Sequence, residues 1–192
     1  GFSGIRNYSG STFTSGFSFN VPTQDVVDEF ESGDIRKDVA ILDIEAWAAD
    51  TGATFGTGFE HTGYFNRKYL PRIRSANALG DLNLTNPNNY RAIRYADVLL
   101  MAAEANSKKT SPDQTKARLY LNKVRERAFG STSNAINASG NALQEAINHE
   151  RRVELAGEGH RFFDLVRTGR AAQKIEGFTL NKNELFPLPL EE

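Results

Sequence analysis

The chain has 192 residues, of which 39% are hydrophobic and 24% are charged, and its formal net charge at pH 7 is −1. This composition predicts a folded protein, and it lacks the excess of Lys and Arg that nucleic-acid binding usually requires. The sequence has no cysteine, which excludes disulfides, cysteine-based zinc sites and cysteine nucleophiles. No apolar run approaches the length of a membrane span. The polar, glycine-rich start resembles the interior of a longer protein or a processed end.

Residues 1–88 are predicted to be loop-rich. Residues 1–65 hold 11 of the 20 aromatic residues and 9 of the 16 glycines, mixed with Ser and Thr and without a sustained helical period. One short helix is expected around Val26 and Phe30, and alternating side chains over 62–72 favour a strand. This portion is the candidate ligand-contact region.

Residues 89–192 are predicted to be helical and to end in an extended tail. Apolar residues recur at spacings of three and four in three segments: Ile93, Ala96, Leu100 and Ala103; Ala117, Leu121, Val124 and Ala128; Leu143, Ile147 and Val153. Ser111 and the following proline indicate the start of the second helix. A fourth, short helix is expected through Phe162 to Gly169, and prolines exclude helix in the tail. We expect both portions to form one structural unit.

The stretch HERRVELAGEGHRFFDLVRTG at 149–169 places four arginines close to four carboxylates in the sequence. A zinc hydrolase would need a second histidine four residues after His149, where the sequence has Val153. Nearby arginines are expected to lower the pKa of these carboxylates and keep them ionised, whereas a general acid needs a raised pKa. We therefore interpret the stretch as two short helices joined by buried ion pairs, and expect no catalytic residue, metal or cofactor. The expected structural ion-pair network is Glu150, Arg151, Glu154, Glu158, Arg161, Asp164 and Arg167.

Four segments, in this order, resemble the C-terminal region of the SusD/RagB family. They read RAIRYADVLLMAAEA at 91–105, ARLYLNKVRERA at 117–128, LQEAINHERRVELAGEGHRFFDLVRTG at 143–169 and NELFPLPLEE at 183–192. Residues 21–41 and 62–69 are also similar to that family. The resemblance covers most of residues 17–192.

The resemblance implies a mainly α fold of tetratricopeptide-like helix pairs with a loop-rich portion that carries ligand contacts. Members of the family are lipoproteins on the outer surface of the outer membrane, and they are not enzymes. They bind glycans or other nutrients and deliver them to a TonB-dependent transporter of the SusC type. Full members are longer and begin with a signal peptide and a lipid-bearing cysteine, so we expect this chain to be a C-terminal fragment.

A sugar site needs flat aromatic faces beside polar side chains. Trp47, the only tryptophan, and Tyr64 are the best candidates for ligand binding. His61 is a candidate hydrogen-bonding neighbour, and Phe59 is a weaker candidate because it has no polar group. Packing of these side chains against the core is the competing explanation.

Two other functions remain open at this point. The chain could be a tetratricopeptide-like module that binds a peptide or the transporter and has no glycan site. A glycoside hydrolase is the third possibility, and it would need two carboxylates facing each other across a cleft. The candidates for that pair are Asp43, Glu45 and Asp50, close to Trp47 in sequence.

Overall fold

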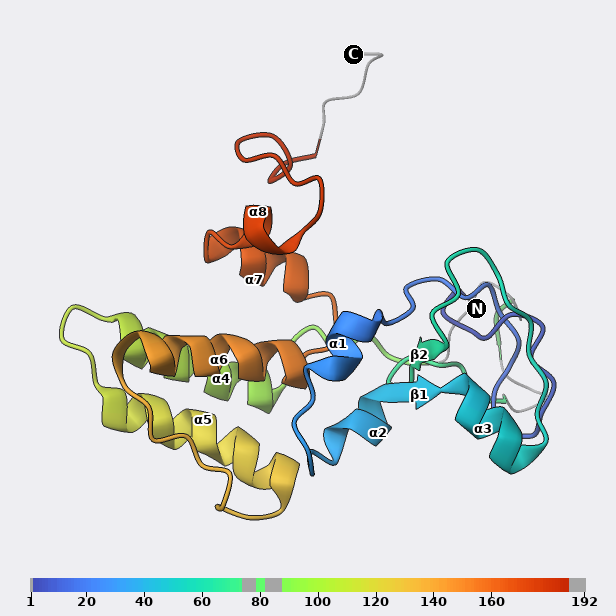
Figure 1. The fold of residues 1–192 in the computed structure, drawn as a ribbon, viewed down its shortest axis with the longest axis horizontal. Helices are drawn as coiled ribbons and strands as arrows, with labels where there is room; N and C mark the ends of the chain where they lie inside the picture. Colours follow the sequence, from blue (N-terminus) through green and yellow to red (C-terminus); the bar gives the residue numbers. More distant parts are fainter. Residues whose placement is uncertain (1, 74–78, 82–87, 187–192) are drawn as a thin grey trace. The chain divides into compact units, whose positions relative to one another are not determined.

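The computed structural model describes residues 2–73, 79–81 and 88–186, which form two compact units (Figure 1). The first unit ends at Gly157 and the second begins at Glu158, whereas composition placed a division after residue 88. The first unit contains α1 (Gln24–Asp28), α2 (Arg36–Ala40), β1 (Ile41–Asp43), α3 (Ile44–Thr51), β2 (Tyr64–Asn66), α4 (Tyr95–Lys108), α5 (Gln114–Phe129) and α6 (Gly140–Glu154). The second contains α7 (Arg161–Arg167) and α8 (Ala171–Lys174).

The helices α4, α5 and α6 pack side by side and share one apolar core (Figure 1). The predicted stripes provide this core except for Leu99, which was not predicted. The core comprises Ala96, Leu99, Leu100, Ala103, Ala117, Leu121, Val124, Leu143 and Ile147. Ile93 is an exception, because it precedes α4 and is 70% exposed. The helical period therefore predicted which faces of these helices are buried.

The start of α5 differs from the prediction. The helix begins at Gln114, and the carboxylate of Asp113 accepts a hydrogen bond from the backbone N–H of Lys116 at 3.0 Å. Asp113 rather than Ser111 is therefore the N-cap, because its side chain reaches the free amides of the first turn. The side chain of Gln114 instead accepts from the backbone N–H of Gly140 at 2.9 Å, which joins the starts of α5 and α6.

Among its described residues, the loop-rich portion contains three short helices where the sequence predicted one. The predicted helix is α1, and α2 and α3 were missed. Asp43 caps α3 by accepting from the backbone N–H of Ala46 at 3.0 Å, and Gly52 ends it with φ 72°. The predicted strand is present but covers only β2, which pairs antiparallel with β1. The register places Leu42 opposite Phe65, and both side chains are buried.

The end of α6 packs against this portion. Val153 and Ala156 share an apolar cluster with residues of α1, α2 and β1. The side-chain amide of Asn66 donates to the carbonyl oxygen of Gly157 at 2.9 Å. Gly157 has φ 75°, and a Cβ at this position would lie 2.4 Å from the Asn66 amide nitrogen. A larger residue here would be strained by the positive φ and would displace the Asn66 side-chain amide.

In the second unit, α7 corresponds to the predicted fourth helix. Within it, Arg167 pairs with Asp164 at 2.6 Å, one helical turn earlier. The predicted extended tail falls largely on 187–192, which lie outside the described residues. Among the residues that the structure describes, no helix is long and apolar enough to cross a membrane.

Candidate ligand-binding site

A pocket of about 390 Å³ lies at the surface of the first unit, in the size range of small-ligand sites. Val27, Ile41, Leu42 and Ala46 contribute its apolar lining. Two aromatic and five charged residues complete the lining, namely Trp47, Tyr64, Lys37, Asp38, Asp43, Asp50 and Arg67. The pocket therefore combines aromatic, acidic and basic groups from α2, β1, α3, β2 and the residue that follows β2.

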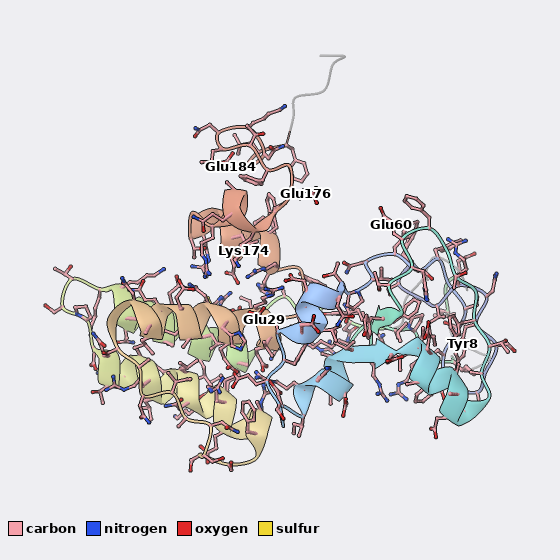
Figure 2. All side chains as sticks on the ribbon, viewed as in Figure 1. Tyr8, Glu29, Glu60, Lys174, Glu176 and Glu184 are labelled. Carbon is pink, nitrogen blue, oxygen red and sulfur yellow. The ribbon has the colours of Figure 1, made fainter. Side chains whose placement is uncertain are left out.

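Trp47 lies on α3 and serves both the core and the pocket. Its indole Nε1 donates to the hydroxyl of Tyr8 at 3.2 Å, and its ring lies 5.5 Å from the ring of the buried Phe13. Figure 2 shows Tyr8 in the loop-rich end of the unit. The guanidinium of Arg67 lies over the same indole, 5.6 Å from its centroid. These contacts hold the half-buried ring in place without burying it completely.

Tyr64 enters the pocket through the pairing of the two strands. The register sets Tyr64 opposite Asp43, the residue that caps α3. The Tyr64 hydroxyl donates to Gln24 Oε1 at 3.1 Å. The sheet therefore brings a phenol and the start of the tryptophan-bearing helix together.

The five charged residues of the pocket are not neutralised by one another. Within the part of the chain that the structure describes, none of them has an oppositely charged side chain within 4.0 Å. Asp43 accepts from a backbone N–H, and Arg67 Nη1 donates to the carbonyl oxygen of Asp38 at 2.9 Å. The pocket thus offers both donors and acceptors to a ligand.

The other sequence candidates lie elsewhere. Phe59 is 94% exposed and does not line the pocket. His61 stacks on Phe55 with ring centroids 5.8 Å apart, and it also lies outside the pocket lining. Of the three carboxylates considered for hydrolysis, Asp43 and Asp50 line the pocket and Glu45 does not.

Sequence reasoning missed Lys37, Asp38 and Arg67. All three are ordinary surface residue types in unremarkable local sequence. The signal that could have found Arg67 is the strand register, because its backbone N–H continues the β2 edge by donating to Ala40 at 2.9 Å. A correct pairing of the two strands from sequence would have placed Arg67 beside α2.

The charged stretch forms part of a second cluster of charges, and this one is buried. Glu150 is fully buried on α6, where its carboxylate accepts from Arg36 Nη1 at 2.6 Å and from Arg125 Nη1 at 2.9 Å. Glu154, one turn later, pairs with Arg36, Arg94 and Arg127. Both partners of Glu150 therefore come from outside the stretch, which corrects the expectation that the stretch neutralises itself.

Two neighbouring positions of α6 also pair with distant residues. Arg151 pairs with Asp97 of α4 at 2.8 Å, and both side chains are buried. Arg152 pairs with Glu29, just after α1, at 2.7 Å, and His149 Nδ1 lies 3.0 Å from Glu29. Glu29 is seen beside the end of α6 in Figure 2. Glu158, Arg161, Asp164 and Arg167 belong to the second unit.

The cluster holds its carboxylates in the ionised form. Burial by itself would raise the pKa of Glu154, but hydrogen bonds from three arginines outweigh burial and lower the pKa to about 2. The hydrogen bond from Arg125 similarly lowers the pKa of Glu31. No group of three or more metal-ligating side chains occurs among the described residues. The geometry is that of a scaffold that fixes α6 against α2 and α5.

Comparison with known proteins identifies the fold. The model of the SusD family matches residues 8–185. The chain belongs to the SusD family. SusD-like protein P2 of Formosa agariphila is 31% identical over 97% of this chain and 40% of the relative. The chain thus spans about two fifths of the length of this relative.

Solved structures of SusD-like proteins are also similar to this chain. A laminarin-binding SusD-like protein superposes with a TM-score of 0.80 at 38% identity, over 97% of this chain and 40% of that protein. Surface glycan-binding protein A from Bacteroides thetaiotaomicron, solved in complex with laminarihexaose, has a TM-score of 0.71 at 26% identity, over 90% of this chain and 37% of that protein. The predicted mainly α, tetratricopeptide-like SusD fold is therefore confirmed.

Proposed function

We propose that this chain supplies a glycan-contacting pocket to a cell-surface binding protein that delivers its ligand to a TonB-dependent transporter of the SusC type. The observation that carries the proposal is the pocket itself, where Trp47 and Tyr64 lie beside charged side chains that do not neutralise one another. Sugar hydroxyls both donate and accept hydrogen bonds, so they match such a mixture. The apolar face of a sugar ring matches an aromatic side chain.

The family and its relatives support the class of ligand. One similar structure is a laminarin-binding protein, and another was solved with laminarihexaose. A laminarin-type glucan is therefore the first ligand to test on this chain. SusD-like proteins are in general lipoproteins of the outer-membrane surface, which supports the same location for the protein that carries this chain.

The proposed activity is binding without hydrolysis. Asp43 caps α3 by accepting a hydrogen bond from the backbone N–H of Ala46, so this carboxylate already has a structural role. The similar structures are described as glycan-binding proteins. Incubation with laminarin should release no shorter sugars, and release that depends on Asp43 and Asp50 would contradict this part of the proposal.

Trp47 provides the test of binding, because the chain has no other tryptophan. Laminarihexaose should change its fluorescence in a saturable way and raise the melting temperature, since a ligand that binds only the folded state stabilises it. A panel of soluble glycans that leaves both fluorescence and melting temperature unchanged would contradict a glycan site in this chain.

A protein-interaction module is the second candidate, and one observation favours it. Tyr95, Val98 and Met101 follow one side of α4 at helical spacing and are all exposed, Tyr95 by 71%. Exposed apolar faces of this kind mark contacts with other proteins. Val98→Asp should then abolish capture of the transporter while leaving laminarihexaose binding intact. Capture unaffected by this change would count against the face as the docking surface.

A further inference from the structure

Arg67 is held against the wall of the pocket at two points. Its backbone N–H donates to the carbonyl oxygen of Ala40 at 2.9 Å, and its Nη1 donates to that of Asp38, also at 2.9 Å. Both acceptors belong to α2. The side chain therefore lies along the pocket lining, where it is half-buried, instead of extending into solvent.

The guanidinium and the indole form one continuous surface. The guanidinium carbon lies over the Trp47 ring at 5.6 Å from the centroid, within the range of a cation–π contact. The indole is itself fixed by Tyr8 and by packing on Phe13. Because the guanidinium covers part of an indole face, a sugar ring that enters the pocket beside Trp47 must also contact Arg67.

Arg67 retains most of its hydrogen-bonding capacity. An arginine side chain carries five N–H donors, and in the described part of the chain only one contact, to the Asp38 carbonyl, is made by those of Arg67. No carboxylate lies within ion-pair distance of it among the described residues. Its remaining donors are available to a ligand in a fixed, planar arrangement.

We propose that Arg67 determines which glycans the pocket accepts, a role that rests on the glycan-binding function proposed above. Glucans built from the same sugar differ in linkage: a 1→3 link removes a different ring hydroxyl from a 1→4 link, and α and β 1→4 links orient successive rings differently. A fixed set of donors pairs with one pattern of hydroxyls and is left unpaired by another. Such unpaired donors cost binding energy and give selectivity that an aromatic face alone lacks.

The test compares three glucose hexasaccharides that differ in linkage: laminarihexaose, cellohexaose and maltohexaose. Dissociation constants are measured for the unchanged chain and for Arg67→Met, which keeps an apolar stem over the indole and removes every donor. The ratio between the weakest and the tightest dissociation constant should fall about ten-fold in this variant. Arg67→Lys keeps the positive charge without the planar arrangement of donors. It should therefore lose selectivity, but its affinity should fall less than that of Arg67→Met.

Phe59→Ala is the matched control, because this aromatic side chain lies outside the pocket. In Phe59→Ala the ratio between the weakest and the tightest dissociation constant should equal that of the unchanged chain. A uniform decrease or increase of all three affinities in Arg67→Met would overturn the proposal, because it would show a general contact or a cover over Trp47. Absence of binding by the unchanged chain would instead refute the glycan site itself. Should Arg67→Met fail to fold, Arg67→Lys decides the question by the same ratio.

Discussion

Three consecutive residues of α2 belong to two different electrostatic environments. Arg36 points to the buried cluster, where it contacts Glu150 and Glu154. Lys37 and Asp38 line the pocket, and neither has an ion-pair partner among the described residues. In the first environment Glu150 and Glu154 each contact at least two arginines, and in the second the charges of both signs are available to solvent.

The difference separates charges that maintain the fold from charges suited to ligands. A buried charge without a partner is costly, so paired clusters persist even where they do no chemistry. An accessible charge without a partner is not costly in water, and it can bind a ligand without first breaking an internal contact. The abundance of charge in the stretch 149–169 is therefore a poor guide to the binding site.

Removal of Glu150 should have the largest effect on stability. Glu150→Ala leaves Arg36 and Arg125 without the carboxylate between them, so the free energy of unfolding should fall by about 3–5 kcal/mol. Urea denaturation measures this change. Glu126→Ala, at an exposed position of α5, is the control and should change stability by less than about 0.5 kcal/mol. Loss of glycan affinity in folded Glu150→Ala would mean that the two regions are not separate.

Acid should weaken the same cluster. The pKa of Glu154 is about 2 in the folded protein against 4.5 ordinarily, so its ionised form stabilises the fold above about pH 4.5. This contribution, roughly 3 kcal/mol, is lost as the pH falls from 4.5 towards 2. Glu154→Gln should be less stable than the unchanged chain at neutral pH and approach it near pH 2. Parallel pH profiles of unfolding free energy would contradict this assignment.

Trp47→Ala should mainly lower glycan affinity, whereas Glu150→Ala should mainly lower stability. We expect glycan affinity to fall at least ten-fold, which corresponds to about 1.4 kcal/mol. The free energy of unfolding should fall by about 1–2 kcal/mol, because the indole also packs on Phe13. This is less than the fall expected for Glu150→Ala. Calorimetric titration at low temperature measures affinity in the folded variant. Unchanged affinity would leave Trp47 as a packing residue only.

The smallest effect is expected at Phe59. Its side chain is almost fully exposed and lies outside the pocket, so Phe59→Ala should change neither stability nor affinity by more than about 0.5 kcal/mol. Thermal unfolding and laminarihexaose titration check both quantities. A clear loss of affinity would extend the ligand-contact surface beyond the pocket.

The sequence was sufficient for features that depend on local periodicity. Glu150 shares a helical face with Leu143 and Ile147, so its burial followed from spacing alone, and the structure confirms it. Its partner Arg36 lies 114 residues earlier, and only tertiary packing brings the two together. The same limit explains why Lys37 and Arg67 were missed, because they come to line one pocket through a strand pairing that three-residue strands do not reveal in sequence. Trp47 and Tyr64, which both line the pocket, were chosen as candidates from residue type alone, which requires no knowledge of their neighbours.

Gly157 is a point at which the buried charge cluster and the pocket are not independent of each other. It lies three residues after the end of α6, and the amide of Asn66 lies where its side chain would be. Asn66 is the last residue of β2, directly before Arg67. A methyl group added at Gly157 would therefore displace the side-chain amide of Asn66 from its hydrogen bond to the Gly157 carbonyl oxygen, one residue before the pocket's arginine.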